Sequence, residues 1–162
     1  MRLLLRAGAH RPVPGGVEVA ASPDTPRREA WQWHVRVLEG RSGHGEEQAD
    51  VERLTLSLPR SGGLPAVLEV SCDPDAAAAR AEVVISGEPV TLERDVHEVT
   101  VLVVGQGGVR VEGRHLLHEL DAMVLEGDDP LRPELERVGE EPTSVAVVRL
   151  RSTASQPISW VP

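Results

Sequence analysis

The chain has 162 residues, a formal net charge of -9 at pH 7, 40% hydrophobic residues and only 2% aromatic residues. This length suits one domain with a proper core, and the acidic charge argues against binding to nucleic acid or to anionic membranes. Because the chain has no Lys and no Tyr, it can supply neither a Schiff-base or P-loop amine nor a phenolic acid.

All 17 basic residues are Arg, and Phe and Asn are absent as well, a bias that we interpret as that of a GC-rich bacterial genome. The single cysteine, Cys72, cannot form an internal disulfide and lies next to Asp73, so we expect a buried, unreactive thiol in a reducing compartment. No apolar run approaches the roughly 18 residues of a membrane span. We therefore expect a cytoplasmic protein.

Alternation of apolar and polar residues predicts strands in the first half of the chain. Residues 2–7 and 16–21 are expected to be strands joined by a turn at 10–15, and 22–29 a surface loop. In the strand 31–38, Trp31, Trp33, Val35 and Val37 share one face, and His34 and Arg36 share the other. A polar loop at 40–50 precedes strands at 51–58 and 66–70, and a turn at 76–80 leads into a strand at 81–85.

In the middle of the chain, glycines and polar residues separate three Val-rich apolar runs, 99–104, 109–111 and 122–125. Val suits a pleated surface and Gly supplies the positive φ of hairpin turns, so this pattern predicts antiparallel strands. Further strands are expected at 134–137 and 145–150, and Ile158 and Trp160 are expected to dock the tail on the barrel. The fold class is therefore all-β, with less than about a tenth of the residues in helix against a usual third.

A weak internal repeat has an offset of 45 residues. Residues 50–63 and 95–108 share five identical positions of fourteen, including the Gly-Gly pair at the end of each segment. With the matched order of strand, turn and strand, this suggests a duplicated β unit. We therefore expect a single domain over 1–162, built from two half-barrels at about 1–90 and 91–162.

Five short motifs occur in the order found in one family: the opening Arg2–Pro23 with Pro14-Gly15-Gly16-Val17-Glu18, Trp33 in its strand, Val51-Glu52-Arg53, Gly87-Glu88-Pro89-Val90, and Leu120–Gly127. On these motifs the chain resembles the HutD family, which includes Ves-like proteins. The resemblance implies a compact, cupin-like (bicupin) β barrel. It also implies non-enzymatic binding of a small metabolite, linked to histidine utilisation. The family's "W-K-N-G-G-G-x-T-R-E" run is shortened here, so only Glu18 and Arg53 are transferred as candidate ligand residues.

A metal-binding cupin needs three or four His and carboxylate ligands that converge on one ion. Here the position before the central hairpin offers only His97-Glu98, and no His follows Glu126-Gly127-Asp128-Asp129. We therefore predict neither a metal nor another cofactor, and no catalytic residue is assigned.

The predicted ligand-binding residues are Arg36, Arg53, His34 and Glu18. Two placements stay open for His34 and Arg36: they line the barrel interior, where a cation and an imidazole suit a carboxylate ligand, or they face water while the Trp and Val face fills the core. Three functions stay open as well: a binder of a small acidic metabolite, a degenerate cupin enzyme, and a β-barrel interaction module without a small-molecule site. A homodimer is compatible with each.

Overall fold

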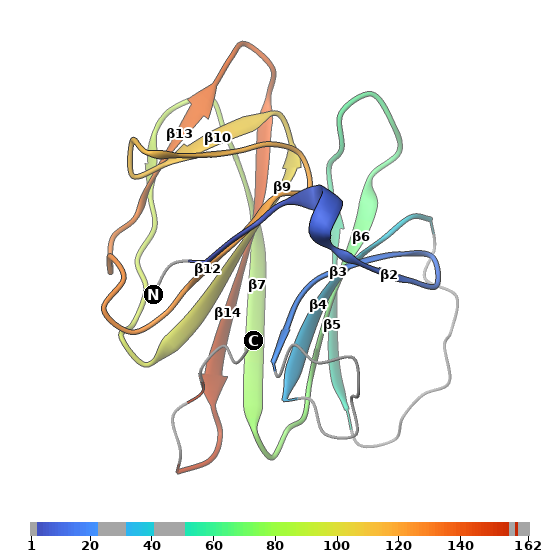
Figure 1. The fold of residues 1–162 in the computed structure, drawn as a ribbon, viewed down its shortest axis with the longest axis vertical. Coiled ribbons are helices and arrows are strands. Elements are labelled where there is room, and N and C mark those ends of the chain that lie inside the picture. Colours follow the sequence, from blue (N-terminus) through green and yellow to red (C-terminus); the bar gives the residue numbers. More distant parts are fainter. Residues whose placement is uncertain (1–2, 23–31, 41–50, 156–157, 159–162) are drawn as a thin grey trace.

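The computed structural model describes residues 3–22, 32–40, 51–155 and 158 (Figure 1). Within these ranges, fourteen strands form three antiparallel sheets, and the one helical element is a 3-10 turn, η1 (Ala7–Ala9). No helix in this part of the chain is long and apolar enough to cross a membrane. The predicted all-β fold with little helix is confirmed.

The central sheet has the strand order β1 (Leu3–Leu5), β12 (Ala122–Leu125), β9 (Glu98–Gln106), β14 (Thr143–Ser152) and β7 (Ala77–Ser86). The long strand β14 pairs with β9 on one side and with β7 on the other. Strands from the two ends of the chain therefore meet in one sheet.

Two further sheets flank the central one (Figure 1). The N-terminal sheet has the order β2 (Arg11–Val13), β3 (Gly16–Ser22), β4 (Trp33–Leu38), β6 (Ala66–Cys72) and β5 (Glu52–Leu58). The small sheet has the order β11 (His115–Leu117), β10 (Gly108–Val111), β13 (Glu134–Val138) and β8 (Val90–Thr91).

Each flanking sheet encloses its own apolar core against the central sheet. The first core joins Val35 and Leu68 of the N-terminal sheet to Val101 of the central sheet, and the second joins Leu102 of the central sheet to Val109 of the small sheet. Because the central sheet is buried on both faces, its strands read as continuous apolar runs and not as alternating ones. This explains the unbroken Val-Leu run in β9.

Several predicted strand boundaries need correction. The predicted turn at 10–15 contains the strand β2, which pairs with β3, and its Pro12 is tolerated because β2 is an edge strand. The predicted turn at 76–80 is wrong from Ala77 on, because β7 starts there and pairs with the last residues of β14. Tertiary pairing overrides the low strand propensity of alanine at these positions. The short strand β8 was not predicted.

The 45-residue offset aligns strands that hold different positions in their sheets. Among the described strands, β5 lies at a sheet edge and pairs with β6 alone, whereas β9 lies at the centre of its sheet between β12 and β14. The strands β1 and β7 of the first half also pair with β12 and β14 of the second half. The two halves of the chain thus interlock, and the boundary at about residue 90 stays a prediction.

The tail meets its prediction in part. Ile158 is 8% exposed and belongs to the first core, as expected for a docked tail. Trp31, Trp160, and most of the predicted loops at 22–29 and 40–50 lie outside the described residues.

Candidate functional site

The four predicted ligand residues lie on one face of the N-terminal sheet. Trp33, Val35 and Val37 of β4 point into the first core, so alternation places His34 and Arg36 on the opposite face. This face, which we call the polar face, carries Arg11, Glu18, His34, Arg36, Arg53, Glu69 and Ser71.

The strand register arranges these side chains in two rows. Arg36 of β4 lies between Glu18 of β3 and Glu69 of β6. In the next row, Ser71 of β6 is the partner of both His34 and Arg53. Residues from four different strands, far apart in the sequence, are thus brought together.

Ion pairs connect the rows. Arg36 Nε lies 3.4 Å from Glu18 Oε2, and Arg36 Nη1 lies 3.9 Å from Glu69 Oε1. Arg53 Nε lies 3.6 Å from Glu69 Oε2, and Arg11 Nη1 lies 3.5 Å from Glu18 Oε1. Each buried carboxylate therefore holds two guanidinium groups.

The carboxylates are buried, and the guanidinium groups reach the surface. Glu18 and Glu69 are 4% and 5% exposed, whereas the side chains of Arg36 and Arg53 are 30% and 38% exposed. His34 is 4% exposed. The face with Trp33, Val35 and Val37 fills the core, as one of the two predicted placements required. That placement also put His34 and Arg36 in water, but His34 is buried and Arg36, like Arg53, is only partly exposed.

Sequence reasoning missed three members of the polar face: Glu69, Ser71 and Arg11. Glu69 had a visible signal, because a charged residue between Leu68 and Val70 in a strand must point away from the core or be paired. The partnership of Glu69 with two arginines depends on strand order, which no local pattern reveals.

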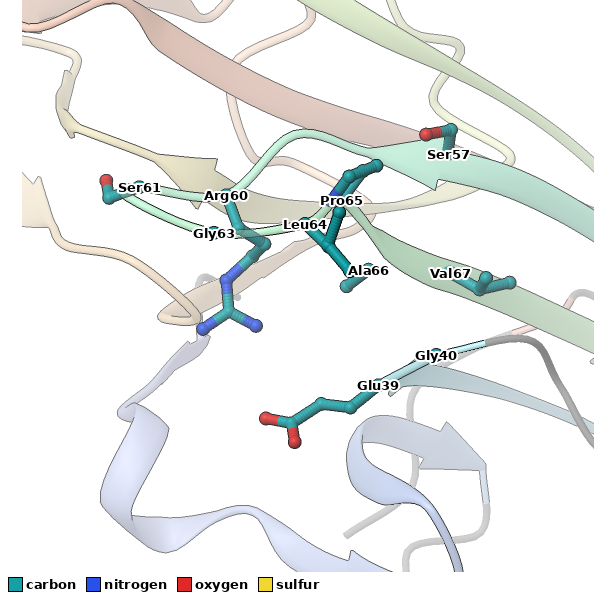
Figure 2. A pocket seen from close by; sticks show the side chains of 10 residues that line it. All are labelled: Glu39, Gly40, Ser57, Arg60, Ser61, Gly63, Leu64, Pro65, Ala66 and Val67. Carbon is teal, nitrogen blue, oxygen red and sulfur yellow. The ribbon is translucent and has the colours of Figure 1, made fainter.

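A pocket of about 610 Å³ lies at the end of the same face, beneath the β5–β6 hairpin (Figure 2). Its residues are Glu39, Gly40, Ser57, Arg60, Ser61, Gly63, Leu64, Pro65, Ala66 and Val67. Ser57 and Val67 are register partners, two residues along the strands from Glu69, so the pocket floor lies about 6.6 Å from the row that holds Arg36.

The charged groups of this pocket come from its rim. Figure 2 shows the Arg60 guanidinium and the Glu39 carboxylate directed into the space between the hairpin and Gly40. Arg60 Nε pairs with Glu119 Oε1 at 2.5 Å, and the two side chains are 20% and 28% exposed. This contact ties the hairpin to the turn after β11. Arg60 was not predicted, because it lies in a turn with no periodic pattern.

Comparison with known proteins bears on the fold. No protein family model and no curated protein matches the sequence. Among solved structures, the chain is similar to PA5104, a conserved protein of unknown function from Pseudomonas aeruginosa PAO1, with a TM-score of 0.72, 18% identity, and coverage of 94% of this chain and 99% of that one. It is also similar to HutD from Pseudomonas fluorescens SBW25 (formate condition), with a TM-score of 0.70, 15% identity, and coverage of 95% and 100%.

The chain has the HutD-type, cupin-like fold. The fold expected from the sequence motifs is therefore confirmed, at an identity that marks the chain as divergent. The pirin YhhW from Escherichia coli, solved in complex with nickel(II), has a TM-score of 0.59 and 10% identity, and the match covers 92% of this chain and 98% of that one.

The described residues of this chain do not fit a cupin metal centre. Within residues 3–22, 32–40, 51–155 and 158, no three His, Cys, Asp or Glu side chains gather where they could hold an ion. His97 is exposed in the turn before β9, and the adjacent Glu98 is buried among arginines. The side chains that could bind a metal are therefore either paired with arginines, as Glu98 is, or too far apart to share one ion.

Cys72 is buried in the first core and has no nucleophilic character. Burial, and then the charges of Glu52 and Asp73, raise the pKa of its thiol to about 12. At neutral pH the thiol stays protonated, which agrees with the unreactive role expected from its acidic neighbours.

Proposed function

We propose that this protein is a non-enzymatic binder of a small acidic metabolite, which it holds at the polar face of the N-terminal sheet. The observation that carries the proposal is the placement of Arg36 and Arg53, two partly exposed guanidinium groups held by one buried carboxylate, Glu69. The pocket beneath the β5–β6 hairpin continues this face and offers room for the rest of a ligand.

The chemistry suits a carboxylate. Arg keeps its charge after desolvation, and its planar fork grips both oxygens of a carboxylate at once. In the described part of the chain, Arg36 uses Nε and Nη1 on glutamates and Arg53 uses Nε alone. The remaining N–H groups, Nη2 of Arg36 and both Nη atoms of Arg53, are the donors that a ligand carboxylate would take.

The other two predicted residues have different parts in this proposal. An anion would be repelled by Glu18 at short range, so Glu18 serves to orient Arg36 and does not itself touch the carboxylate. His34 lies one row away, next to Ser71 and in the same row as Arg53, and because it is buried its part in the proposal is to support this row and not to touch the ligand.

The probes follow from the family resemblance. Because the sequence motifs and the fold both lead to HutD, acids of histidine breakdown come first in a thermal-shift screen, followed by other small carboxylates and by divalent metals. A ligand at 100 times its Kd stabilises the folded state by about 2.7 kcal/mol, a clear rise in Tm. We expect an acid, and no metal, to produce it.

Arginine variants connect a positive result to the polar face. Arg36→Ala and Arg53→Ala should each lose the ligand-induced rise in Tm. Arg110→Ala should keep it, because Arg110 is a surface arginine of β10, 45% exposed and 3.9 Å from Glu136. A rise that persists in both polar-face variants would refute the proposed site.

One observation favours a second function, a protein-interaction module. Leu64 at the tip of the β5–β6 hairpin is 89% exposed, and Pro65 and Val67 line the pocket beside it. A contiguous exposed apolar patch marks a binding surface for another protein, and these three neighbouring residues would form the start of one. If no acid stabilises the protein, Leu64→Ser is the variant with which to look for a lost interaction.

A further inference from the structure

A second group of arginines surrounds a buried carboxylate at the far end of the central sheet. Glu98, the first residue of β9, lies on the face of this sheet that is turned toward the small sheet. Along this face, Leu102 and Val147 belong to the second core. Two residues further toward Glu98, at Thr100 of β9 and Arg149 of β14, the same face becomes polar.

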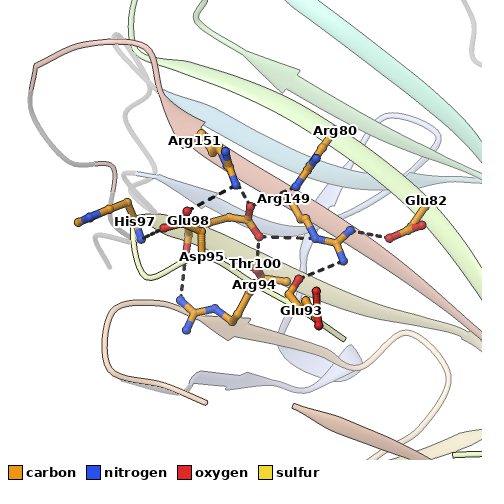
Figure 3. A network of polar contacts seen from close by, with 10 residues as sticks. All are labelled: Arg80, Glu82, Glu93, Arg94, Asp95, His97, Glu98, Thr100, Arg149 and Arg151. Atoms are coloured by element: carbon orange, nitrogen blue, oxygen red, sulfur yellow. Dashed lines mark hydrogen bonds and ion pairs between the residues drawn. The ribbon is translucent and has the colours of Figure 1, made fainter. Parts of the chain in front are cut away.

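Three guanidinium groups converge on this carboxylate (Figure 3). Arg151 Nε lies 3.2 Å and Arg80 Nη2 3.7 Å from Glu98 Oε2, and Arg149 Nε lies 3.6 Å from Oε1. Thr100 Oγ1 donates a hydrogen bond of 3.1 Å to Oε1. The Glu98 side chain is 0% exposed, so these groups replace its water completely.

The three arginines differ in how many of their donors are used. Arg149 is 12% exposed and uses all three nitrogens, on Glu98, on Glu82 and on the carbonyl of Glu93. Arg151 uses Nε on Glu98 and Nη2 on Asp95, which lies at 3.7 Å. Arg80 uses only Nη2.

The unused donors belong to two neighbouring side chains. In the described residues, Nε and Nη1 of Arg80 and Nη1 of Arg151 have no partner, and these side chains are 67% and 55% exposed. Arg80 and Arg151 contact the same oxygen of Glu98, so their guanidinium groups are neighbours, and one oxyanion between them would accept charge-assisted hydrogen bonds of about 2.8 Å from both.

A recess of about 160 Å³ adjoins these donors, lined by Ala78, Ala79, Arg80, Arg149 and Arg151. Its charged residues are all arginines. Ala78 is the register partner of Arg151, so a methyl group stands where a longer side chain would cover the guanidinium. A neighbouring recess shares Arg80 and Arg149 but is also lined by Glu82 and Glu93, and it lacks this excess of positive charge.

We propose that Arg80, Arg149 and Arg151 form a second ligand site, for a small oxyanion such as a phosphate or carboxylate group. Arg80 and Arg151 bind the anion, and Arg149 is a positioning residue. The buried Glu98 holds the three cations side by side and is itself shielded from the ligand. The site lies on the central sheet and is separate from the polar face of the N-terminal sheet.

Burial of Glu98 alone does not account for this arrangement. Arg149, which is mostly buried, already pairs with the carboxylate, and Thr100 adds a hydrogen bond. The exposed arginines Arg80 and Arg151 add little stability, because ion pairs that are open to water are screened and contribute little to folding. Their convergence on one recess is better explained by a ligand.

The test measures binding of inorganic phosphate and of malonate by thermal shift and calorimetry, at an ionic strength held constant with NaCl. The parent protein should bind at least one of the two. Arg80→Gln and Arg151→Gln should each weaken that binding about tenfold or more, since a hydrogen bond to a charged group is lost. Arg80→Lys should recover part of it, and Arg110→Gln, the matched surface control, should bind like the parent.

The two anions separate a phosphate-bearing ligand from a carboxylate ligand, and either result supports the site. Binding of neither anion above the NaCl control, or equal binding by Arg80→Gln and the parent, would overturn it. Far-UV circular dichroism checks that each variant is folded. If Arg151→Gln does not fold, the result for Arg80→Gln is used alone, because Arg80 is the more exposed of the two arginines. Arg53→Ala should leave phosphate binding intact, so failure of one site does not imply failure of the other.

Discussion

Asp121 joins the N-terminal segment to the second half of the chain. Its carboxylate accepts hydrogen bonds from Ala7 N at 2.9 Å, from His118 N at 3.0 Å and from Arg6 Nη1 at 2.7 Å. The side chain is 6% exposed, and Arg6 also donates to the carbonyl of Leu116. We expect Asp121→Asn to destabilise the protein, because an amide offers one oxygen where the carboxylate offers two.

The size of the destabilisation follows from the groups that Asp121→Asn leaves without a hydrogen-bond partner. One backbone N–H, of Ala7 or of His118, would face the amide NH₂, and an unsatisfied buried donor costs about 1–3 kcal/mol. The Arg6 side chain is 54% exposed, so loss of its ion pair adds at most about 1 kcal/mol. The expected loss is about 2–3 kcal/mol, which for a domain of this size lowers Tm by about 5–10 °C.

The effect should depend on pH. Burial raises the pKa of the Asp121 carboxyl, but the hydrogen bonds from His118 and Ala7 and the contact with Arg6 outweigh burial and leave the pKa below its ordinary value. The stabilisation is therefore complete above the unfolded pKa of about 3.9 and is lost as the pH falls through the lower folded pKa. Urea unfolding of parent and variant should show a constant difference from pH 7 to pH 5 that shrinks below about pH 4.

The control is Asp75→Asn, since Asp75 is exposed and its side chain makes no hydrogen bond in the described residues. That variant should unfold like the parent at every pH. A difference for Asp121→Asn that stays below about 0.5 kcal/mol at pH 7, the ordinary size of a surface substitution, would contradict this account of the carboxylate. So would a difference that is the same at pH 3 as at pH 7.

Three further predictions concern buried groups. Glu98→Gln should cost about 2 kcal/mol in urea unfolding, because Arg149, 12% exposed, loses one of its two carboxylate partners and keeps only Glu82; a cost near zero would mean that water reaches the cluster. The Cys72 thiol, whose pKa is raised to about 12, should react with a thiol reagent at pH 8 only when the protein unfolds, and rapid labelling of the folded protein would contradict its burial. Gly16→Ala should disrupt the pairing of β3 with β4, since the added methyl would overlap the Val37 carbonyl oxygen; circular dichroism and Tm measure the loss, and an unchanged Tm would refute it.

Much of the fold could be predicted because its local patterns are strong. β4 and β5 alternate along one buried face, and the Val runs of β9, β12 and β14 are bounded by Gly, Pro or charged residues. The strands that were missed have weak local signals. Pro12 argued against a strand at β2, and the alanines argued against a strand at the start of β7. Pairing with β3 and with β14 nevertheless makes both segments strands.

The candidate site was predictable by residue type and not by partner. Alternation placed His34 and Arg36 on one face, and the family motif pointed to Glu18 and Arg53. The pairing of Arg36 with Glu18 and Glu69 depends on which strands are neighbours, and strand order is not encoded in any single segment. The cluster around Glu98 was missed for the same reason, since Arg80, Arg149 and Arg151 lie on strands that meet only in the folded sheet.

The most direct test of the central claim is a calorimetric titration of the best acid from the screen into the parent protein and into the Arg36→Ala/Arg53→Ala double variant. At the polar face, the parent should bind one acid per chain. The double variant should bind at least about 30-fold more weakly, which corresponds to the roughly 2 kcal/mol of one lost hydrogen bond to a charged group. Equal affinity in the two proteins would show that the polar face is not the ligand site.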